Sequence, residues 1–385
     1  MKVSILAPNV SSNSFGRAYL LAKVLSRNYE TELIGPSIGK GIWSPLSGEK
    51  SVPVKTITMN GLIRPYFQMK QIVRMVDGDI VYCSKPLLTS LGVGLYLKKN
   101  SAKPLVLDID DWELGFAKDQ FFRKDGLNIR YLLSSSVYPY KAYSIWNFLV
   151  MERFIRFADE VTVSNSFLQE KFGGRILWHG RDTSTLDPTK YKGEVIRNKY
   201  KINSQAKVIM FLGTPRPHKG LIQLINSVNL LRDSRITLVI VGVDDNPYSK
   251  ELTKYGKNTL GDHLVFFGQQ PFEKVPEFLS MADVVAIPQE KGHSTLGQIP
   301  AKIFDAMSMA KPIVATNVSD ISHILEGCGW IVEPGNVELL AEAIQYFLDH
   351  PQEADETGRL ARQRCIQYYS WDSMENCLLE LFNKF

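Results

Sequence analysis

Residues 207–220 read KVIMFLGTPRPHKG, and they decide how many sheets the chain contains. The first six residues are an apolar run typical of a buried strand, and the rest form a loop bounded by Gly213 and Gly220. We expect the helix that follows to reach Leu231. Residues 183–205, just before this unit, are polar and lack a sustained period, as a linker does. The strand–loop–helix unit therefore begins a second sheet.

Strands and helices alternate on both sides of this point, which predicts an α/β fold with two doubly wound parallel sheets. A chain of 385 residues also suggests about two domains. We expect an N-terminal domain at 1–187, a second domain at 188–367, and a C-terminal helix at 368–385 packed across the join, with Met374, Leu378, Leu381 and Phe385 on one face. The predicted strands cover 2–7, 31–35, 79–82, 104–108, 160–164, 175–178, 207–212, 236–242, 266–268, 282–288, 312–316 and 330–332.

The charge is unevenly distributed along the chain. Residues 1–182 hold 24 Lys and Arg against 16 Asp and Glu, whereas the remainder holds 21 against 24. This argues against a nucleic-acid binder and for one half that meets something anionic. The four cysteines lack metal-ligand spacing, and we expect no transmembrane helix because no stretch of about 18 residues is continuously apolar.

Two segments of the second half suit an anionic ligand. In the 213–220 loop, Arg216 and Lys219 are two cations at the end of a strand, which suits a diphosphate; a solvated loop is the alternative. In residues 294–316, Pro300 precedes a short helix that carries Lys302 and Asp305. The start of such a helix can bind an anion, although a plain core helix would look the same.

Two features of the first half also suggest ligand contacts. Asp110 and Asp111, in the run 108–112 (DIDDW), follow a strand where active sites form. Crowded carboxylates raise one another's pKa and could contact a substrate, but helix capping or a divalent metal would use the same residues. Gly16 follows the first strand and either admits a ligand close to the backbone or serves as a turn.

Residues 112–157 carry 12 of the 41 aromatic residues, flanked by Arg and Lys. Such a segment suits an element that lies on a membrane surface. An insertion packed on the domain core, or a dimer contact, would have the same composition.

The order of these motifs resembles the retaining glycosyltransferases of family 4, which have the GT-B fold of two Rossmann-like domains facing across a cleft. The resemblance spans nearly the whole chain. It rests on Gly16-Arg17, Ala158–Ser164, His179-Gly-Arg-Asp182, Pro217-His-Lys-Gly220, Lys311–Ala315 and Tyr369-Ser-Trp-Asp372.

The resemblance implies transfer of a sugar from a nucleotide diphosphate sugar to a hydroxyl acceptor with retention, in polysaccharide or glycolipid synthesis. It implies that Arg216 and Lys219 bind the diphosphate, and that Asp305 takes the place of the family's ribose-binding Glu. We predict catalytic roles for Asp110, Asp111, Arg216 and Lys219, with the two aspartates as polar contacts to the acceptor or donor sugar. The predicted donor-binding residues are Gly16, Arg216, Lys219, Gly242, Ser294, Gly297, Gln298, Lys302 and Asp305.

The chain departs from the family pattern at two places. Gly297 stands where the family has its sugar-reading Glu, so His293, Ser294 and Gln298 become candidates for that contact; Asp110-Asp111 stands where the family often has a His. These losses leave open a catalytically silent nucleotide-sugar-binding partner or sensor. We expect no metal or other cofactor, a sugar or lipid-linked acceptor, no nucleic-acid partner, and a cytoplasmic location with an anionic membrane surface as an open further partner.

Overall fold

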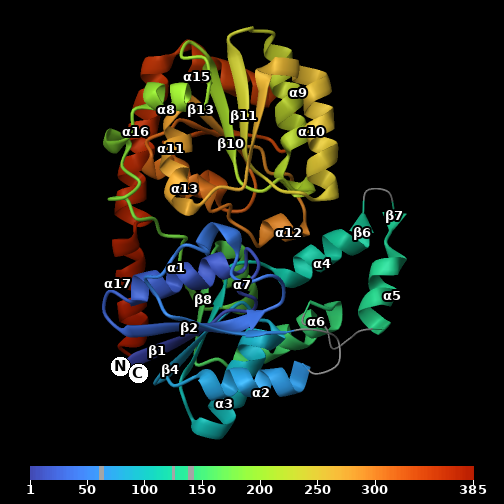
Figure 1. Cartoon of the computed structure of the whole chain (residues 1–385), viewed down its shortest axis with the longest axis vertical. Coiled ribbons are helices and arrows are strands. Elements are labelled where there is room, and N and C mark those ends of the chain that lie inside the picture. The colour runs from blue at the N-terminus through green and yellow to red at the C-terminus, as the bar shows by residue number, and fades with distance from the viewer. Residues whose placement is uncertain (60–64, 124–125, 138–142) are drawn as a thin grey trace. The chain divides into compact units, whose positions relative to one another are not determined.

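The computed structural model describes residues 1–59, 65–123, 126–137 and 143–385. The chain divides into two compact units. Unit 1 comprises residues 1–179, 292–299 and 374–385, and unit 2 comprises residues 180–291 and 300–373. Each unit is an α/β domain built on its own parallel sheet (Figure 1).

The described residues of unit 1 form a seven-stranded parallel sheet in the order β3-β2-β1-β4-β5-β8-β9. Because β1 pairs with β2 on one side and with β4 on the other, the direction of winding reverses between β1 and β4. The strands are β1 (Lys2–Leu6), β2 (Glu30–Ser37), β3 (Val54–Thr58), β4 (Ile80–Ser84), β5 (Leu105–Ile109), β8 (Glu160–Val163) and β9 (Arg175–Ile176).

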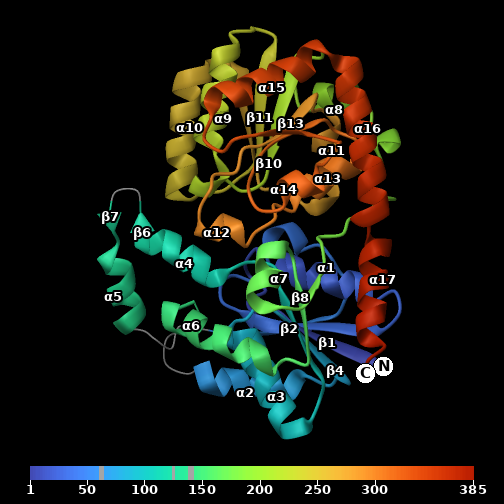
Figure 2. The ribbon, with the colours of Figure 1, turned by 180° about the vertical axis from the view of Figure 1, so that it is seen from behind.

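Helices cover both faces of this sheet. Figure 2 shows α17 alongside the sheet of unit 1. One core packs α2, α3, α4, α6 and α7 against the strands. On the other face, the Phe382 ring of α17 lies 5.8 Å from that of Tyr82. The helices are α1 (Phe15–Leu25), α2 (Pro65–Met75), α3 (Val93–Ser101), α4 (Glu113–Phe121), α5 (Ile129–Val137), α6 (Ile145–Phe154), α7 (Ser166–Phe172), α12 (His293–Leu296) and α17 (Trp371–Phe382).

The described residues of unit 2 form a six-stranded parallel sheet in the order β12-β11-β10-β13-β14-β15. Here the winding reverses between β10 and β13. The main core packs α9, α10 and α15 on one face. The strands are β10 (Lys207–Leu212), β11 (Ile236–Val243), β12 (Leu264–Gly268), β13 (Val284–Ile287), β14 (Ile313–Thr316) and β15 (Trp330–Val332). The helices are α8 (Gly193–Lys199), α9 (Leu221–Leu231), α10 (Pro247–Leu260), α11 (Val275–Ser280), α13 (Lys302–Ser308), α14 (Ile321–Ile324), α15 (Val337–Asp349) and α16 (Pro351–Tyr368).

The two-sheet prediction is confirmed, and the differences have local causes. The first segment of unit 1 ends at His179, whereas the expected domain ended at 187, and residues 292–299 lie in unit 1 rather than in the second domain. The polar 183–205 segment contains α8, whose Arg197 bonds to Asp283 at 2.8 Å. Strand β3 was not predicted because its five residues alternate and none is fully buried. Phe385 is exposed, whereas Met374, Leu378 and Leu381 are buried as predicted.

Among the residues that the structure describes, every helix is too short or too polar to cross a bilayer.

Candidate functional site

Parallel sheets bind ligands at the carboxyl ends of their strands, at the point where the winding reverses. In unit 2 this point lies after β10, where Gly213 and Gly242 touch. A Cβ on Gly242 would lie 2.9 Å from the Gly213 carbonyl carbon, and both residues have positive φ angles, 135° and 105°. Side chains are excluded there by contact and by backbone conformation alike. The two glycines therefore allow the loops after β10 and β11 to pack closely at the strand ends.

Lys302 lies directly beside the loop that contains Gly213. It is the first residue of α13, its side chain is buried, and its Nζ is 3.4 Å from the centroid of the Phe211 ring. A Cβ on Gly213 would lie 3.3 Å from this Nζ, so the ammonium points at the glycine loop. Burial and the neighbouring charge of Lys219 hold the pKa of Lys302 well below its usual value. A buried cation in this state gains free energy from any anion that reaches it.

Arg216 lies in the same loop but is bound to a carboxylate of its own unit. Its Nη2 is 3.0 Å from Asp244 Oδ2, and Asp244 also accepts a 2.7 Å hydrogen bond from Ser249. These hydrogen bonds lower the pKa of Asp244 against the opposing effect of its burial. The Arg216 guanidinium is therefore held by Asp244, in the turn after β11. No sequence motif marked Asp244.

Asp305 is also paired within unit 2. Arg181 donates from Nε and Nη2 to the Asp305 carboxylate, and its Nη2 also reaches the Ala301 carbonyl at 3.0 Å. Both side chains are largely buried. Arg181 comes from the His179-Gly-Arg-Asp182 motif, in which no separate role was predicted for it. Any ribose contact by Asp305 must share the carboxylate with this guanidinium.

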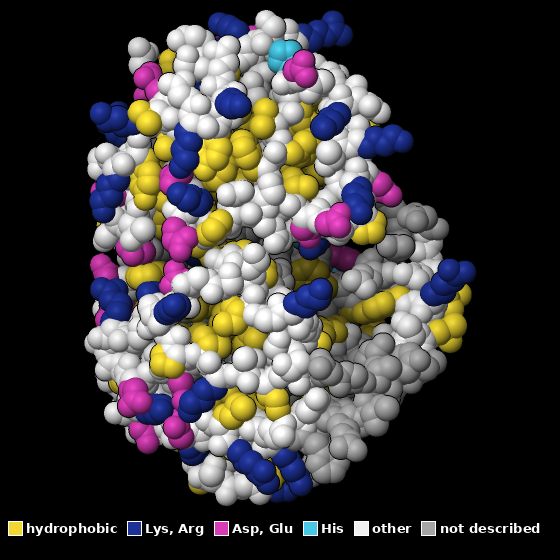
Figure 3. Space-filling model, viewed as in Figure 1, with side chains coloured by type: hydrophobic (Ala, Val, Ile, Leu, Met, Phe, Trp, Pro, Cys, Tyr) yellow, Lys and Arg dark blue, Asp and Glu magenta, His cyan; other side chains and the backbone are white. Residues whose placement is uncertain are grey.

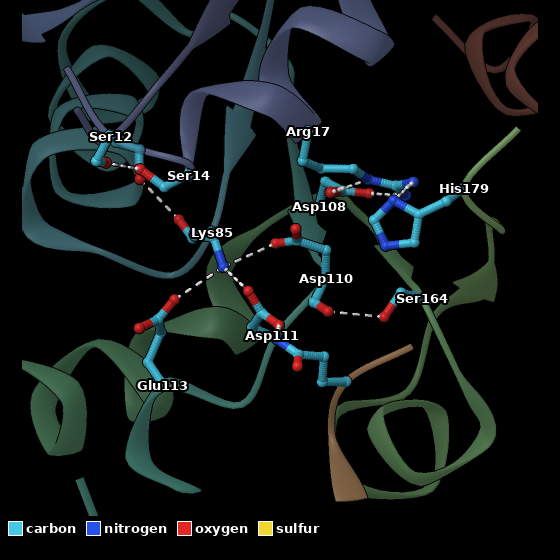
Figure 4. Close-up of polar contacts among 12 residues, drawn as sticks. Ser12, Ser14, Arg17, Lys85, Asp108, Asp110, Asp111, Glu113, Ser164 and His179 are labelled. Atoms are coloured by element: carbon cyan, nitrogen blue, oxygen red, sulfur yellow. Dashed lines mark hydrogen bonds and ion pairs between the residues drawn. The ribbon is translucent and has the colours of Figure 1, made fainter. Parts of the chain in front are cut away.

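In unit 1 the equivalent point lies between β1 and β4, and it holds a buried lysine. Lys85 follows β4 with a φ of 67°, a strained conformation for a lysine. Its Nζ bonds to Asp111 and lies 3.1 Å from Asp110 and 2.9 Å from Glu113 (Figure 4). Lys85, Asp110, Asp111 and Glu113 form the Lys85 cluster. Ser12 and Ser14, from the loop after β1, lie beside it in the same view.

The Lys85 cluster holds more negative than positive groups. Burial raises the pKa of Asp110 to about 7, and Asp111 adds to this effect while Lys85 opposes it. Burial would lower the pKa of Lys85, but the three carboxylates raise it well above its usual value. The predicted carboxylate with a raised pKa is thus present, although burial contributes more than crowding. Such a group can accept or donate a proton near neutral pH.

Asp108 takes no part in this cluster. Both of its oxygens accept hydrogen bonds from Arg17, at 2.9 and 2.8 Å, and both residues are buried. Thr162 donates a further bond to the same carboxylate at 2.8 Å. A metal ion bound through the Asp108-x-Asp110 spacing would have to displace these partners. Among the described residues, no group of three or more His, Cys, Asp or Glu could hold a metal ion.

The predicted donor-binding residues of 292–299 lie in unit 1, with the Lys85 cluster. Gln298 donates to Asp111 at 2.7 Å, and the Ser294 amide donates to Asp119 of α4 at 2.8 Å. A Cβ on Gly297 would lie 2.5 Å from the Trp112 Cβ, so this glycine allows the segment to pack on Trp112. The structure thus places Gln298 beside Asp111, Gly297 against Trp112 and Ser294 against Asp119, all in unit 1. Lys302 and Asp305 lie in unit 2.

The remaining predicted residues divide in the same way. Gly16 lies in unit 1, where the Trp43 ring would be 3.3 Å from its Cβ. Arg216, Lys219 and Gly242 lie in unit 2 with Lys302. The sequence reasoning missed Lys85, Arg181 and Asp244. The position of Lys85 just after a predicted strand was the only signal that could have found it.

Comparison with known proteins supports a transferase fold. Residues 193–364 match the family model "Glycosyl transferases group 1"; most of these residues belong to unit 2, and residues 292–299 belong to unit 1. Alpha-maltose-1-phosphate synthase of Mycolicibacterium smegmatis is 24% identical over 222 residues, covering 54% of this chain and 56% of that protein. An MMP alpha-(1->4)-mannosyltransferase of Mycolicibacterium hassiacum is 26% identical over 212 residues, covering 53% and 47%. The chain thus spans about half the length of the curated relatives it matches.

Solved structures resemble the whole chain. HepE of Anabaena, in complex with UDP and glucose, has a TM-score of 0.77 at 18% identity, with all of both chains covered. Sucrose-phosphate synthase of Thermosynechococcus elongatus has a TM-score of 0.73 at 15% identity, covering 100% of this chain and 98% of that one. At these identities the likeness concerns the fold. With its two parallel-sheet domains, the chain has the GT-B fold.

Proposed function

We propose that the chain is a glycosyltransferase that moves a sugar from a nucleotide diphosphate sugar to an acceptor hydroxyl. The observation that carries the proposal is the buried Lys302 ammonium in the group 1 domain. Within the described residues, Lys302 forms no ion pair with a carboxylate, and the neighbouring Lys219 adds a second cation. A diphosphate bound beside Gly213 would supply negative charge next to both cations.

The chemistry follows from charge. When the sugar leaves the diphosphate, the sugar carbon becomes oxocarbenium-like and the leaving group gains negative charge. Lys302, Lys219 and Arg216 would stabilise that charge more in the transition state than in the bound donor. The departing phosphate can take the proton of the attacking hydroxyl. We assign the reaction to the retaining, family 4 type, with a hexose as the sugar transferred.

Unit 1 would bind the acceptor. Asp110 and Asp111 follow β5, and their carboxylates already bind Lys85 and, at Asp111, Gln298, so an acceptor hydroxyl would share these oxygens. Names of similar proteins, such as a lipopolysaccharide 1,2-N-acetylglucosaminetransferase of Salmonella typhimurium at 25% identity, favour a sugar or lipid-linked acceptor. We place the reaction in the cytoplasm, in polysaccharide or glycolipid synthesis.

The experiment is calorimetric titration with UDP, GDP and ADP, followed by measurement of nucleotide release from the matching sugar donors. Lys302→Met should weaken nucleotide binding at least about tenfold, because it removes a charge-assisted contact. Lys250→Met, on an exposed side chain of the same unit, serves as the control. Failure of all three nucleotides to bind, or equal affinity in Lys302→Met, would refute the donor site.

A catalytically silent nucleotide-sugar-binding protein is the second candidate. Gly297 offers no carboxylate to the donor sugar, and its place is filled by packing on Trp112. This candidate predicts nucleotide binding that depends on Lys302 but no release of nucleotide from any sugar donor in the presence of acceptor. Turnover therefore separates the two.

A further inference from the structure

Two helices of unit 1 carry large apolar side chains on their solvent faces. On α5, Ile129 and Leu133 are 59% and 58% exposed, and they lie one turn apart. On α6, Trp146, Val150 and Phe154 are 44%, 44% and 41% exposed at four-residue spacing. Phe157, in the turn that follows α6, is 45% exposed. We call these six side chains the α5–α6 surface.

A hydrogen bond joins the two apolar stripes end to end. Trp146 Nε1 donates to Ser136 Oγ at 3.3 Å. Ser136 lies seven residues after Ile129, and therefore on the same side of α5 as Ile129 and Leu133. Trp146 begins the stripe that continues to Val150 and Phe154. The bond thus places the end of one stripe against the start of the other.

Positive charge borders this surface. Arg130, Arg153 and Arg156 are exposed, and the Arg156 guanidinium lies 4.9 Å from the centroid of the Phe157 ring. Of the described residues in α5, α6 and the following turn, Glu152 is the only carboxylate, and it accepts a 2.7 Å bond from Trp112 Nε1. Figure 3 shows hydrophobic and basic side chains together at the edge of the view where Figure 1 places α5.

From this arrangement we propose that the α5–α6 surface docks on an anionic lipid bilayer. Exposed apolar patches of this kind mark interaction sites, and aromatic rings bordered by arginines suit the headgroup region. Anionic headgroups would neutralise the three arginines. A second copy of the chain fits less well, because a two-fold dimer through this surface would bring two sets of arginines together. The inference goes beyond the proposed transfer reaction and does not depend on it.

Vesicle flotation tests the docking directly. We expect the full chain to float with vesicles of phosphatidylcholine and phosphatidylglycerol, to float poorly with phosphatidylcholine alone, and to be partly released by salt. Absence from the vesicle fraction at low salt overturns the proposal.

Paired variants locate the contact. Replacing Ile129 and Leu133 by Gln should lower the partition constant about tenfold, because apolar area no longer enters the bilayer. The matched control is Val195→Gln with Leu230→Gln, two side chains of unit 2 that are 59% and 48% exposed. Replacing Arg153 and Arg156 by Gln should lower the partition constant on anionic vesicles about fivefold for each charge removed. Equal losses in the control and the test variants would refute the assignment.

Two further measurements test other interpretations of the α5–α6 surface. Brominated lipid should quench the fluorescence of Trp146. Trp146→Phe should remove most of that quenching while the protein still floats. Sedimentation in the absence of lipid tests self-association. A dimer that the Ile129 and Leu133 substitutions dissociate, together with no vesicle binding, would make the surface a subunit interface and overturn the proposal.

Discussion

Two features of the ligand-free protein disfavour the charged form of Lys302. Its side chain is buried, and Lys219, a second cation, lowers its pKa further. The unfolded chain therefore holds this proton more tightly than the folded one, so folding stability rises with pH between the lowered pKa and the ordinary value of 10.5. The residue costs stability, and a bound anion would offset that cost.

The first prediction concerns this cost in stability. Lys302→Met should weaken nucleoside diphosphate binding while leaving the free protein as stable as the wild type or more so, because it removes a buried charge. Calorimetry and denaturant titration measure the two effects on the same sample. A variant that loses stability and affinity together would indicate a structural role instead.

The second prediction follows from the pKa of the same residue. A bound diphosphate should raise the pKa of Lys302, so binding should take up protons and affinity should fall as pH rises. Above the phosphate pKa of about 6, the nucleotide itself contributes little to this uptake. Titration in two buffers of different ionisation enthalpy counts the protons. We expect uptake in the wild type and its loss in Lys302→Met.

The third prediction concerns Lys85. Replacing Lys85 by Met leaves the carboxylates of Asp110, Asp111 and Glu113 without their shared cation, which should cost about 3 to 5 kcal/mol of unfolding free energy. Because the pKa of Asp110 is already raised to about 7, wild-type stability falls as pH rises from about 4 towards 7. In the Lys85→Met variant, this fall of stability with rising pH should continue to higher pH.

Denaturant unfolding of the Lys85 variant at several pH values measures this effect. Adding Asp111→Asn should restore part of the stability, since it removes one of the repelling charges. If the variant loses the same free energy at every pH, electrostatics is not the cause.

At the scale of single elements, sequence patterns predicted the strands better than they predicted the sites. Buried parallel strands are continuous apolar runs, so β10 and β13 could be located from the chain alone. The Lys85 cluster could not be located from the chain alone. It joins residues that follow β4 and β5, and its Asp111 contacts Gln298, which lies 187 positions further along the chain. Gln298 lies in unit 1 because its segment packs on α4, and no local periodicity of the sequence reveals that contact. Arg181 and Asp305 meet for the same reason, at a separation of 124 positions.

The fourth prediction belongs to this element scale and tests how residues 292–299 are held. Gly297→Ala would place a Cβ 2.5 Å from the Trp112 Cβ, which should cost about 1 to 3 kcal/mol through overpacking. Gly48→Ala is the matched control, because nothing lies within 4 Å of its Cβ position. Hydrogen exchange of the α4 amides should quicken in the first variant. An unchanged rate would mean that the segment is not held by this contact.

At the scale of the whole molecule, the chain completes unit 1 only at its C-terminal end. Residues 374–385 belong to unit 1, and the ring of Phe382 lies 5.7 Å from that of Tyr29 and 5.8 Å from that of Tyr82. Glu375 pairs with Arg27 at 2.7 Å, and Glu380 with Arg175 at 2.6 Å. Unit 1 therefore gains its full core only after unit 2 has been synthesised.

The fifth prediction tests that dependence with two phenylalanines three residues apart. Phe382 is fully buried, so Phe382→Ala should lower the unfolding free energy of unit 1 by about 3 to 5 kcal/mol. Phe385 is largely exposed, and Phe385→Ala should change that free energy by less than about 0.5 kcal/mol. Denaturation monitored by hydrogen exchange of β1 and β4 assigns the loss to unit 1. A fragment of residues 1–179 should unfold more readily than the Phe382→Ala variant, because it lacks every contact of α17. If the fragment is as stable as unit 1 in the whole chain, the C-terminal helix is an accessory to this core rather than part of it.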